Sequence, residues 1–164
     1  MDITEYLERK GLGYEHLSED ERKAISNFSL MWSLFEAQLL EENASSRKII
    51  MKCKEWDETA GIDQQLINDQ LAYFQNRYIE NGEPNYRYEH LHLRKNDEPD
   101  LILGVLKGEV DDISSKMACC LIIILRFRNN YFHGIKWAYQ FADQKENFER
   151  SCHLLAGCLD KYAH

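Results

Sequence analysis

Residues able to bind phosphate and move protons gather in one short segment. Its order is Arg126-Phe-Arg128-Asn129-Asn130-Tyr-Phe-His133-Gly134. An imidazole titrates near neutral pH and can accept or donate a proton, and a guanidinium can stabilise negative charge on a phosphate. At about 100° per helical residue, Arg126, Asn129, Asn130 and His133 fall within one narrow sector, whereas Arg128 lies well around the helix. Gly134 favours a helix end there, and an unwound last turn would bring Arg128 back toward His133.

The helix that carries this segment is predicted from the apolar run before it. Residues 117–125 are nine consecutive apolar residues. A helix that is apolar on every face is normally the central, surrounded member of a bundle. Asp111 or Asp112 is expected to cap it, and its end is expected near His133. The run is far shorter than the roughly 20 residues that cross a bilayer, so no membrane partner is predicted.

The remaining pattern predicts an all-α bundle of four to five main helices in a single domain over residues 1–164. Ser18 followed by Glu21 is a capping-box signature, and it starts a helix that runs to about residue 42. Further helices are expected from Ser45 or Ser46 to before Gly61, over 63–80, 100–107 and 144–162. The helix over 63–80 is expected to be closed by Asn81-Gly82. Residues 82–100 hold both prolines and form one irregular insertion, in which the alternation over 86–93 predicts a short strand or an extended loop.

The segment resembles the signature of the HEPN superfamily, in which an arginine, four to six residues and a histidine lie near the end of a bundle helix. A polar residue, often asparagine, typically follows that arginine. Arg128 and His133 match with four residues between them and Asn129 in the polar position. Arg126 and His133 also match, with six residues between them, but Phe127 then occupies the polar position. Arg128 is therefore favoured, and Arg126 stays open as the alternative that simple helix geometry prefers.

The resemblance extends to the first long helix. There Trp32, Phe35 and Glu36 are similar to an aromatic-and-acid pattern of several HEPN groups. Glu36 is a candidate supporting residue, although its simplest role is that of a solvated or half-buried acid.

What the resemblance implies is an HEPN-like bundle acting as a metal-independent endoribonuclease. It would be a toxin or a host-defence effector, built as a symmetric homodimer in which each subunit adds one Arg and one His to a shared cleft. Arg128, His133 and Asn129 would be the catalytic residues. The residues that support them or bind the RNA would be Arg126, Asn130, Lys136 and Glu36. RNA carries its own nucleophile in the 2′-OH, so neither a metal nor another cofactor is needed. The expected products carry a 2′,3′-cyclic phosphate and a 5′-hydroxyl.

The partners that the resemblance implies are an RNA substrate, a second copy of the chain, and an antitoxin or another protein of a defence system. Some HEPN toxins carry a tyrosine two residues after the histidine, and this tyrosine is modified when the toxin is controlled. The corresponding residue here is Ile135, so control of that kind is not expected.

The charge pattern agrees with a focused site rather than a coating protein. The chain of 164 residues has 28 acidic and 20 basic side chains, a net charge of −8. Such acidity argues against a general binder of nucleic acid, which needs a basic surface. Residues 113–142, however, contain no acid and four basic side chains, so this window is +4 and the remainder is −12. Dimerisation through this helix end would concentrate positive potential in one cleft.

The cysteines indicate a reducing compartment, and a cytoplasmic protein is expected. Five is an odd number, Cys119 and Cys120 are adjacent, and there is no Cys-x-x-Cys pair, so no full disulfide framework is predicted. His90 and His92, taken with Cys152, Cys158 and His164, match no closed zinc site, and no metal is expected.

The alternative to a ribonuclease is a protein of the same fold without catalytic activity. His133 alone would cap helix carbonyls and favour the helix dipole. The same cleft would then bind a nucleotide or a partner protein in an assembly module. The stretch over 86–95 has aromatics beside Arg87, His90, His92, Arg94 and Lys95, and it would either stack on RNA bases or pack its tyrosines on the bundle.

Overall fold

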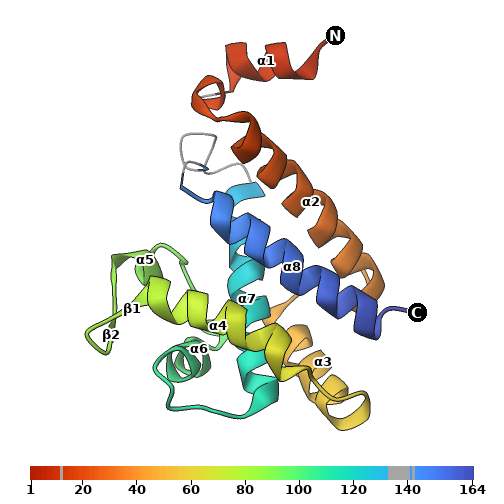
Figure 1. The fold of residues 1–164 in the computed structure, drawn as a ribbon, viewed down its shortest axis with the longest axis vertical. Helices are drawn as coiled ribbons and strands as arrows, with labels where there is room; N and C mark the ends of the chain where they lie inside the picture. The colour runs from red at the N-terminus through yellow and green to blue at the C-terminus, as the bar shows by residue number, and fades with distance from the viewer. Residues whose placement is uncertain (12, 133–140, 142) are drawn as a thin grey trace.

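The part of the chain that the structure describes is an all-helical bundle apart from one small hairpin. The computed structural model describes residues 1–11, 13–132, 141 and 143–164, and the long helices in this part are α2 (Glu19–Leu39), α3 (Ser46–Thr59), α4 (Gln64–Tyr78), α7 (Ile113–Phe132) and α8 (Lys145–Tyr162) (Figure 1). The short helices are α1 (Ile3–Lys10), α5 (Tyr86–Glu89) and α6 (Pro99–Leu106), with single 3-10 turns η1 (Tyr14–His16) and η2 (Lys95–Asp97). The predicted all-α class and the predicted order of long helices are confirmed.

The starts of the long helices are set by side-chain caps. Ser18 Oγ accepts from the Glu21 N–H at 3.1 Å, and Glu21 Oε2 accepts from the Ser18 N–H at 2.8 Å, which completes the capping box. Ser45, Asp63 and Asp112 accept backbone N–H groups in the first turns of α3, α4 and α7. These caps satisfy N–H groups that have no partner inside the helix, so they decide where each helix begins.

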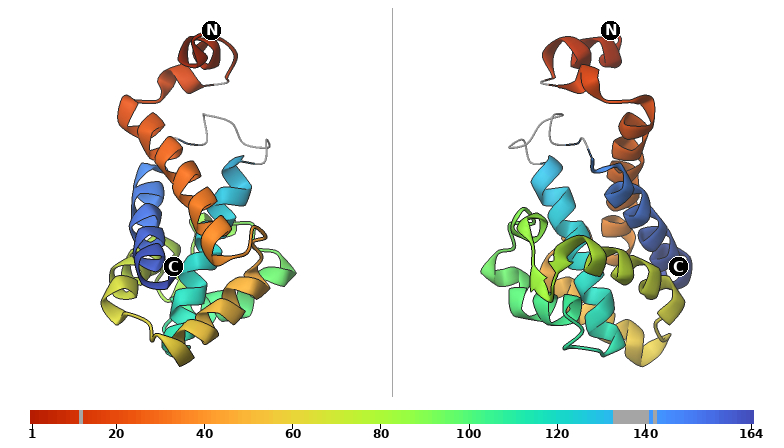
Figure 2. Two further views of the ribbon diagram at one scale, coloured as in Figure 1. Left: turned by 90° about the vertical axis from the view of Figure 1, so that its right-hand side faces the viewer. Right: turned by 60° about the vertical axis from the view of Figure 1, so that its left-hand side comes forward.

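Helix α7 is the centre of the molecule. Its residues from Met117 to Phe127 are all buried. It packs against α3, α4 and α6, while α2 and α8 lie side by side (Figures 1 and 2). The rings of Phe28 on α2 and Phe148 on α8 stack with centroids 4.8 Å apart. The prediction of a central, surrounded helix is confirmed, and α7 leaves the core only after Phe127, where Arg128, Asn129 and Asn130 are half-buried.

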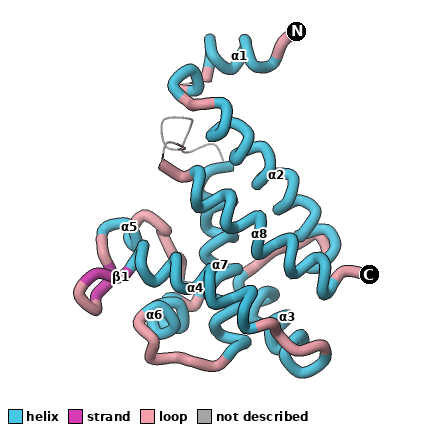
Figure 3. The backbone as a smooth tube through the Cα atoms, in the orientation of Figure 1, coloured by secondary structure: helices cyan, strands magenta, loops and turns pink. Residues whose placement is uncertain are grey.

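The segment after α4 folds differently from the prediction. Strands β1 (Ile79–Glu80) and β2 (Glu83–Pro84) form an antiparallel hairpin (Figure 3). Asn81 and Gly82 are its two turn residues, both with positive φ (52° and 77°), as a tight hairpin requires. The Asn-Gly pair therefore closes a hairpin and is not the cap of α4.

The expected short strand or extended loop over 86–93 is wrong in its first half. Tyr86–Glu89 is the single helical turn α5, because Asn85 Oδ1 accepts the N–H groups of Arg87 and Tyr88. A local cap outweighs the alternating pattern here.

Helix α1 was not predicted, although the sequence holds a signal for it. Asp2 Oδ1 accepts the Thr4 N–H at 2.8 Å and so caps the helix. No residue of α1 is buried, and the helix lies apart from the bundle, near the start of α2 (Figure 2). Ile3, Tyr6 and Leu7 have helical spacing, but none of them is buried, so the helix contributes nothing to the core.

The cysteines behave as small core residues. All five are free, and Cys53, Cys119, Cys120 and Cys158 are buried. Burial raises the pKa of each buried thiol, to about 12 for Cys158, and raises that of the half-buried Cys152 to about 11.

We therefore expect the folded protein to resist thiol reagents at mildly alkaline pH, because the reactive thiolate is scarce below these pKa values. Cys152 should react first and slowly, whereas all five thiols should react at once after unfolding in guanidinium chloride. A chromogenic disulfide reagent measures how many thiols react, and how fast, in the folded and in the unfolded protein. Rapid reaction of two or more thiols in the folded protein would contradict the buried arrangement.

Candidate active site

A buried polar network begins at Arg126, which is 3% exposed. Its Nε donates to the carbonyl oxygen of Leu91 at 3.2 Å, and its Nη2 donates to Oδ1 of Asn130 at 2.9 Å. Its Nη1 lies 3.6 Å from Oδ2 of Asp97. Burial lowers the pKa of Arg126, and the neighbouring Asp97 carboxylate opposes that shift. All three nitrogens of the guanidinium are therefore engaged within the protein.

Asp97 extends the network to two further elements. It is 6% exposed, and its Oδ1 accepts from the Ser46 hydroxyl at 2.6 Å while its Oδ2 accepts from the Arg94 N–H at 2.8 Å. The first residue of α3 and the turn η2 are thus tied to α7. A buried carboxylate with an ionic partner and two hydrogen-bond donors avoids most of the cost of losing water.

Asn130 completes the attachment of the insertion. Its Nδ2 donates to the carbonyl oxygens of Leu91 at 2.9 Å and His90 at 3.4 Å. The irregular segment after the hairpin is therefore held against α7 by Arg126 and Asn130 together. Of the candidate supporting residues, Arg126 and Asn130 are hydrogen-bonded to each other, and both donate to backbone carbonyl oxygens of the insertion.

Arg128 and Asn129 lie differently. Both are half-buried, and Arg128 Nη1 donates to Asn129 Oδ1 at 3.1 Å. Helix α7 is regular through Phe132, so no unwinding brings Arg128 to the Arg126 side before residue 133. Arg128 and Arg126 therefore project from different sides of α7, and Asn129 lies between them around the helix.

Asn129 and Arg126 line a cleft of about 970 Å³ between α3, η2, α6 and α7. Its charged lining is Arg47, Lys54, Arg94, Arg126, Asp97 and Glu98, a net charge of +2 on a chain of net charge −8. Within the described residues, Arg47, Lys54 and Arg94 are exposed and form no ion pair. Such side chains are suited to phosphate oxygens.

The two basic residues from α3 were missed in the sequence. Arg47 and Lys54 are seven positions apart on one helix, with Ile50 and Met51 between them on the same face. This spacing is a signal for a basic helix face. Nothing in the sequence indicated that this face would lie opposite the end of α7.

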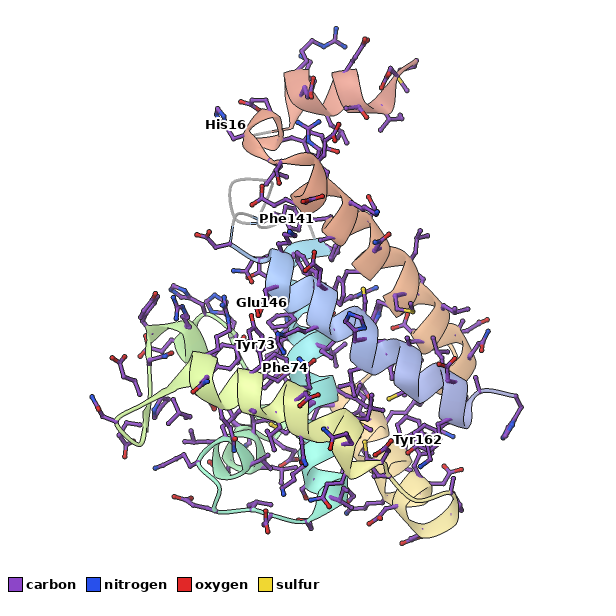
Figure 4. The ribbon with its side chains drawn as sticks, viewed as in Figure 1. His16, Tyr73, Phe74, Phe141, Glu146 and Tyr162 are labelled. Carbon is purple, nitrogen blue, oxygen red and sulfur yellow. The ribbon has the colours of Figure 1, made fainter. Side chains whose placement is uncertain are left out.

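A second cavity, of about 570 Å³, lies on the other side of the end of α7. Asn130 and Tyr131 line it from α7, and Arg77 lines it from α4. Further along α4, Tyr73 lies between α4 and α8 (Figure 4), where its hydroxyl donates to Asn147 Oδ1 at 2.7 Å. The end of α7 is thus flanked by two cavities, each with arginine side chains in its lining.

The other predicted residues are not brought to this site in the described structure. Glu36 is half-buried on α2, and the acid that pairs with Arg126 is Asp97. Trp32 and Phe35 are buried with their rings 5.5 Å apart, so the aromatic part of the predicted pattern belongs to the core. His133 and Lys136 lie outside the described residues.

Residues 1–11, 13–132, 141 and 143–164 contain neither a candidate metal site nor a candidate membrane-spanning helix. No three or more His, Cys, Asp or Glu residues of this part are grouped so as to hold a metal ion. None of its helices has the length and apolar character needed to cross a membrane.

Comparisons of the chain with protein-family models, with curated proteins and with solved structures found no match.

Proposed function

We propose that this protein is a metal-independent endoribonuclease of HEPN type in which Arg128 and His133 are the catalytic pair. The observation that carries the proposal is the position of Asn129. It accepts a hydrogen bond from Arg128 and lines a cleft of net positive charge on an acidic chain. The buried network around Arg126 supports Arg128 as the catalytic arginine, because Arg126 is committed to Asp97, Leu91 and Asn130.

The proposed chemistry needs only RNA and two kinds of side chain. The His133 imidazole accepts the proton of a 2′-OH, the oxygen attacks the adjacent phosphorus, and the bond from phosphorus to the 5′-oxygen breaks. The leaving oxygen takes a proton from the His133 of a second copy across a two-fold axis. Arg128 stabilises the negative charge that grows on the phosphorane, and Asn129 orients its guanidinium.

In this proposal the RNA strand binds along the cleft. Arg47, Lys54 and Arg94 would contact phosphates on either side of the cut without reading sequence. The acidity of the rest of the chain disfavours tight binding to arbitrary nucleic acid. A focused basic site of this kind suits a toxin or defence effector that cuts particular RNA.

RNA cleavage in the presence of EDTA tests the proposal. Wild type should cleave, and His133→Ala should lose activity by about 10²- to 10⁴-fold because general acid–base catalysis is removed. His153→Ala is the matched control, since His153 is an exposed histidine on α8. Circular dichroism establishes that each variant is folded. Undiminished cleavage by folded His133→Ala would overturn the proposal.

The basic cleft also favours a second candidate, a non-catalytic module of the same fold that binds a nucleotide or a protein partner there. The two candidates differ in one result. An absence of cleavage, together with nucleotide or partner binding that Arg128→Ala removes, would select the module.

A further inference from the structure

The 570 Å³ cavity has a lining that the proposed chemistry does not use. Its residues come from α4, from the insertion, from the end of α7 and from the segment before α8. The charged and imidazole side chains among them are Arg77, Arg87, His90 and Asp143. The lining therefore holds two guanidiniums and one carboxylate, and the carboxylate, that of Asp143, is exposed.

Arg77 carries a donor with no acceptor. Its Nε is shielded from solvent and has no hydrogen-bond partner. Within the described residues Arg77 forms no ion pair, and its Cζ lies 5.9 Å from the ring centroid of Tyr78. A buried N–H without an acceptor is uncommon in proteins, and it leaves the Arg77 guanidinium with donor capacity that its protein neighbours do not use. Because the group is a guanidinium, an anionic acceptor fits best.

The rim of the cavity carries an exposed aromatic and a second arginine. Tyr86 is 61% exposed, and Arg87 Cζ lies 5.3 Å from its ring centroid. The His90 ring stands edge-on to Tyr86, with centroids 5.9 Å apart. Tyr88, by contrast, is half-buried against the core. One tyrosine of α5 therefore packs on the bundle, while the other keeps an open face beside cationic groups.

We propose that this cavity binds a nucleotide, with the phosphate held by Arg77 and Arg87 and the base stacked on Tyr86. A planar ring beside arginine side chains is the usual arrangement for a single nucleotide unit, since every base has a face that stacks on an aromatic side chain. The occupant is either one nucleotide of an RNA strand that also enters the cleft beside Asn129 or a free mononucleotide. The first source rests on the proposed function, whereas the second does not.

The experiment measures binding separately from cleavage. A short fluorescein-labelled 2′-O-methyl oligoribonucleotide cannot be cut through its 2′ oxygen, and its fluorescence anisotropy with the full chain gives an affinity. Tyr86→Ala should weaken binding by about ten-fold or more through lost stacking. Arg87→Ala should weaken it and also flatten the dependence of affinity on salt, because one phosphate contact is lost.

Matched controls exist on α1. There Arg9 Cζ lies 5.6 Å from the ring of Tyr6, which is 43% exposed, so Tyr6→Ala and Arg9→Ala remove the same kind of pair far from the cavity. Both control variants should bind the oligonucleotide like wild type. Thermal unfolding of all four variants establishes that the fold is kept.

Competition with AMP, GMP, CMP and UMP separates the two sources. Displacement of the oligonucleotide by a mononucleotide, lost in Tyr86→Ala, identifies a free nucleotide. No displacement, with oligonucleotide binding still lost in Tyr86→Ala, identifies a unit of RNA. Wild-type affinity in both Tyr86→Ala and Arg87→Ala, or no binding of either probe to wild type, overturns the inference. A lack of cleavage leaves this binding result unchanged, so the two proposals fail separately.

Discussion

Arg128→Ala is expected to lower the rate of RNA cleavage by about 10²- to 10³-fold, the usual effect of removing one donor that stabilises developing charge. The variant should unfold close to the wild-type temperature, because Arg128 is half-buried and lies outside the Arg126 network. Arg128→Lys should recover little of the rate, since an ammonium cannot reproduce the planar fork of a guanidinium. Initial rates on a labelled RNA with EDTA present measure both variants.

The matched control for Arg128 is Arg150→Ala. Arg150 is also half-buried, and its Nε pairs with Glu146 at 2.9 Å on α8. This variant should keep the wild-type rate. If Arg128→Ala also keeps that rate while wild type cleaves, Arg128 is not the catalytic arginine and the assignment passes to Arg126.

Asp97→Ala is expected to destabilise the protein by about 3–5 kcal/mol, because it leaves the Arg126 charge buried without its partner. It also removes the acceptor of the Ser46 hydroxyl and of the Arg94 N–H. Denaturant unfolding followed by circular dichroism measures the loss. The double variant Asp97→Leu with Arg126→Met should be less destabilised than Asp97→Ala, since no buried charge remains.

An exposed ion pair provides the comparison. Lys116 Nζ lies 2.7 Å from Asp111 Oδ1, but the Asp111 side chain is 86% exposed. Asp111→Ala should therefore change stability by less than about 1 kcal/mol. Similar losses for Asp97→Ala and Asp111→Ala would contradict the structural role given to the Arg126 network.

Most of the helical framework could be predicted from the sequence because its signals are local. Ser18, Ser45, Asp63 and Asp112 each cap a helix where the pattern indicated one. The apolar run over 117–125 identified the central helix, since a helix without a polar face must be surrounded. These features depend on neighbours within one or two turns.

The elements that were predicted wrongly, or not at all, also have physical explanations. The alternation over 86–93 suggested extended chain, but one asparagine side chain, that of Asn85, captured two N–H groups and made a helical turn. Asn81 and Gly82 suit both a helix end and a hairpin, and only the pairing of β1 with β2 decides between them. Helix α1 has a cap and apolar spacing at Ile3, Tyr6 and Leu7, but these signals span only eight residues and the helix has no buried face.

The sequence named Arg126, Arg128, Asn129 and Asn130 as candidates, but it did not reveal the contacts that these residues make. Angular position alone groups Arg126 with Asn129 and Asn130, which made Arg126 a rival for catalysis. The structure keeps Arg126 beside Asn130 but ties it to an ion pair, because Asp97, 29 positions earlier in the chain, meets Arg126 in the interior. A contact between residues so far apart leaves no local pattern, and the same is true of Arg47 and Lys54 opposite Asn129.

The chemical ends of the cleaved RNA test the central claim most directly. We predict a 2′,3′-cyclic phosphate and a 5′-hydroxyl from wild type in the presence of EDTA, and no product from an RNA with 2′-deoxyribose at the cleaved position. These ends follow from attack by the 2′ oxygen, and His133→Ala should abolish them. Products with a 5′-phosphate and a 3′-hydroxyl, or cleavage of the 2′-deoxy substrate, would contradict the proposed mechanism.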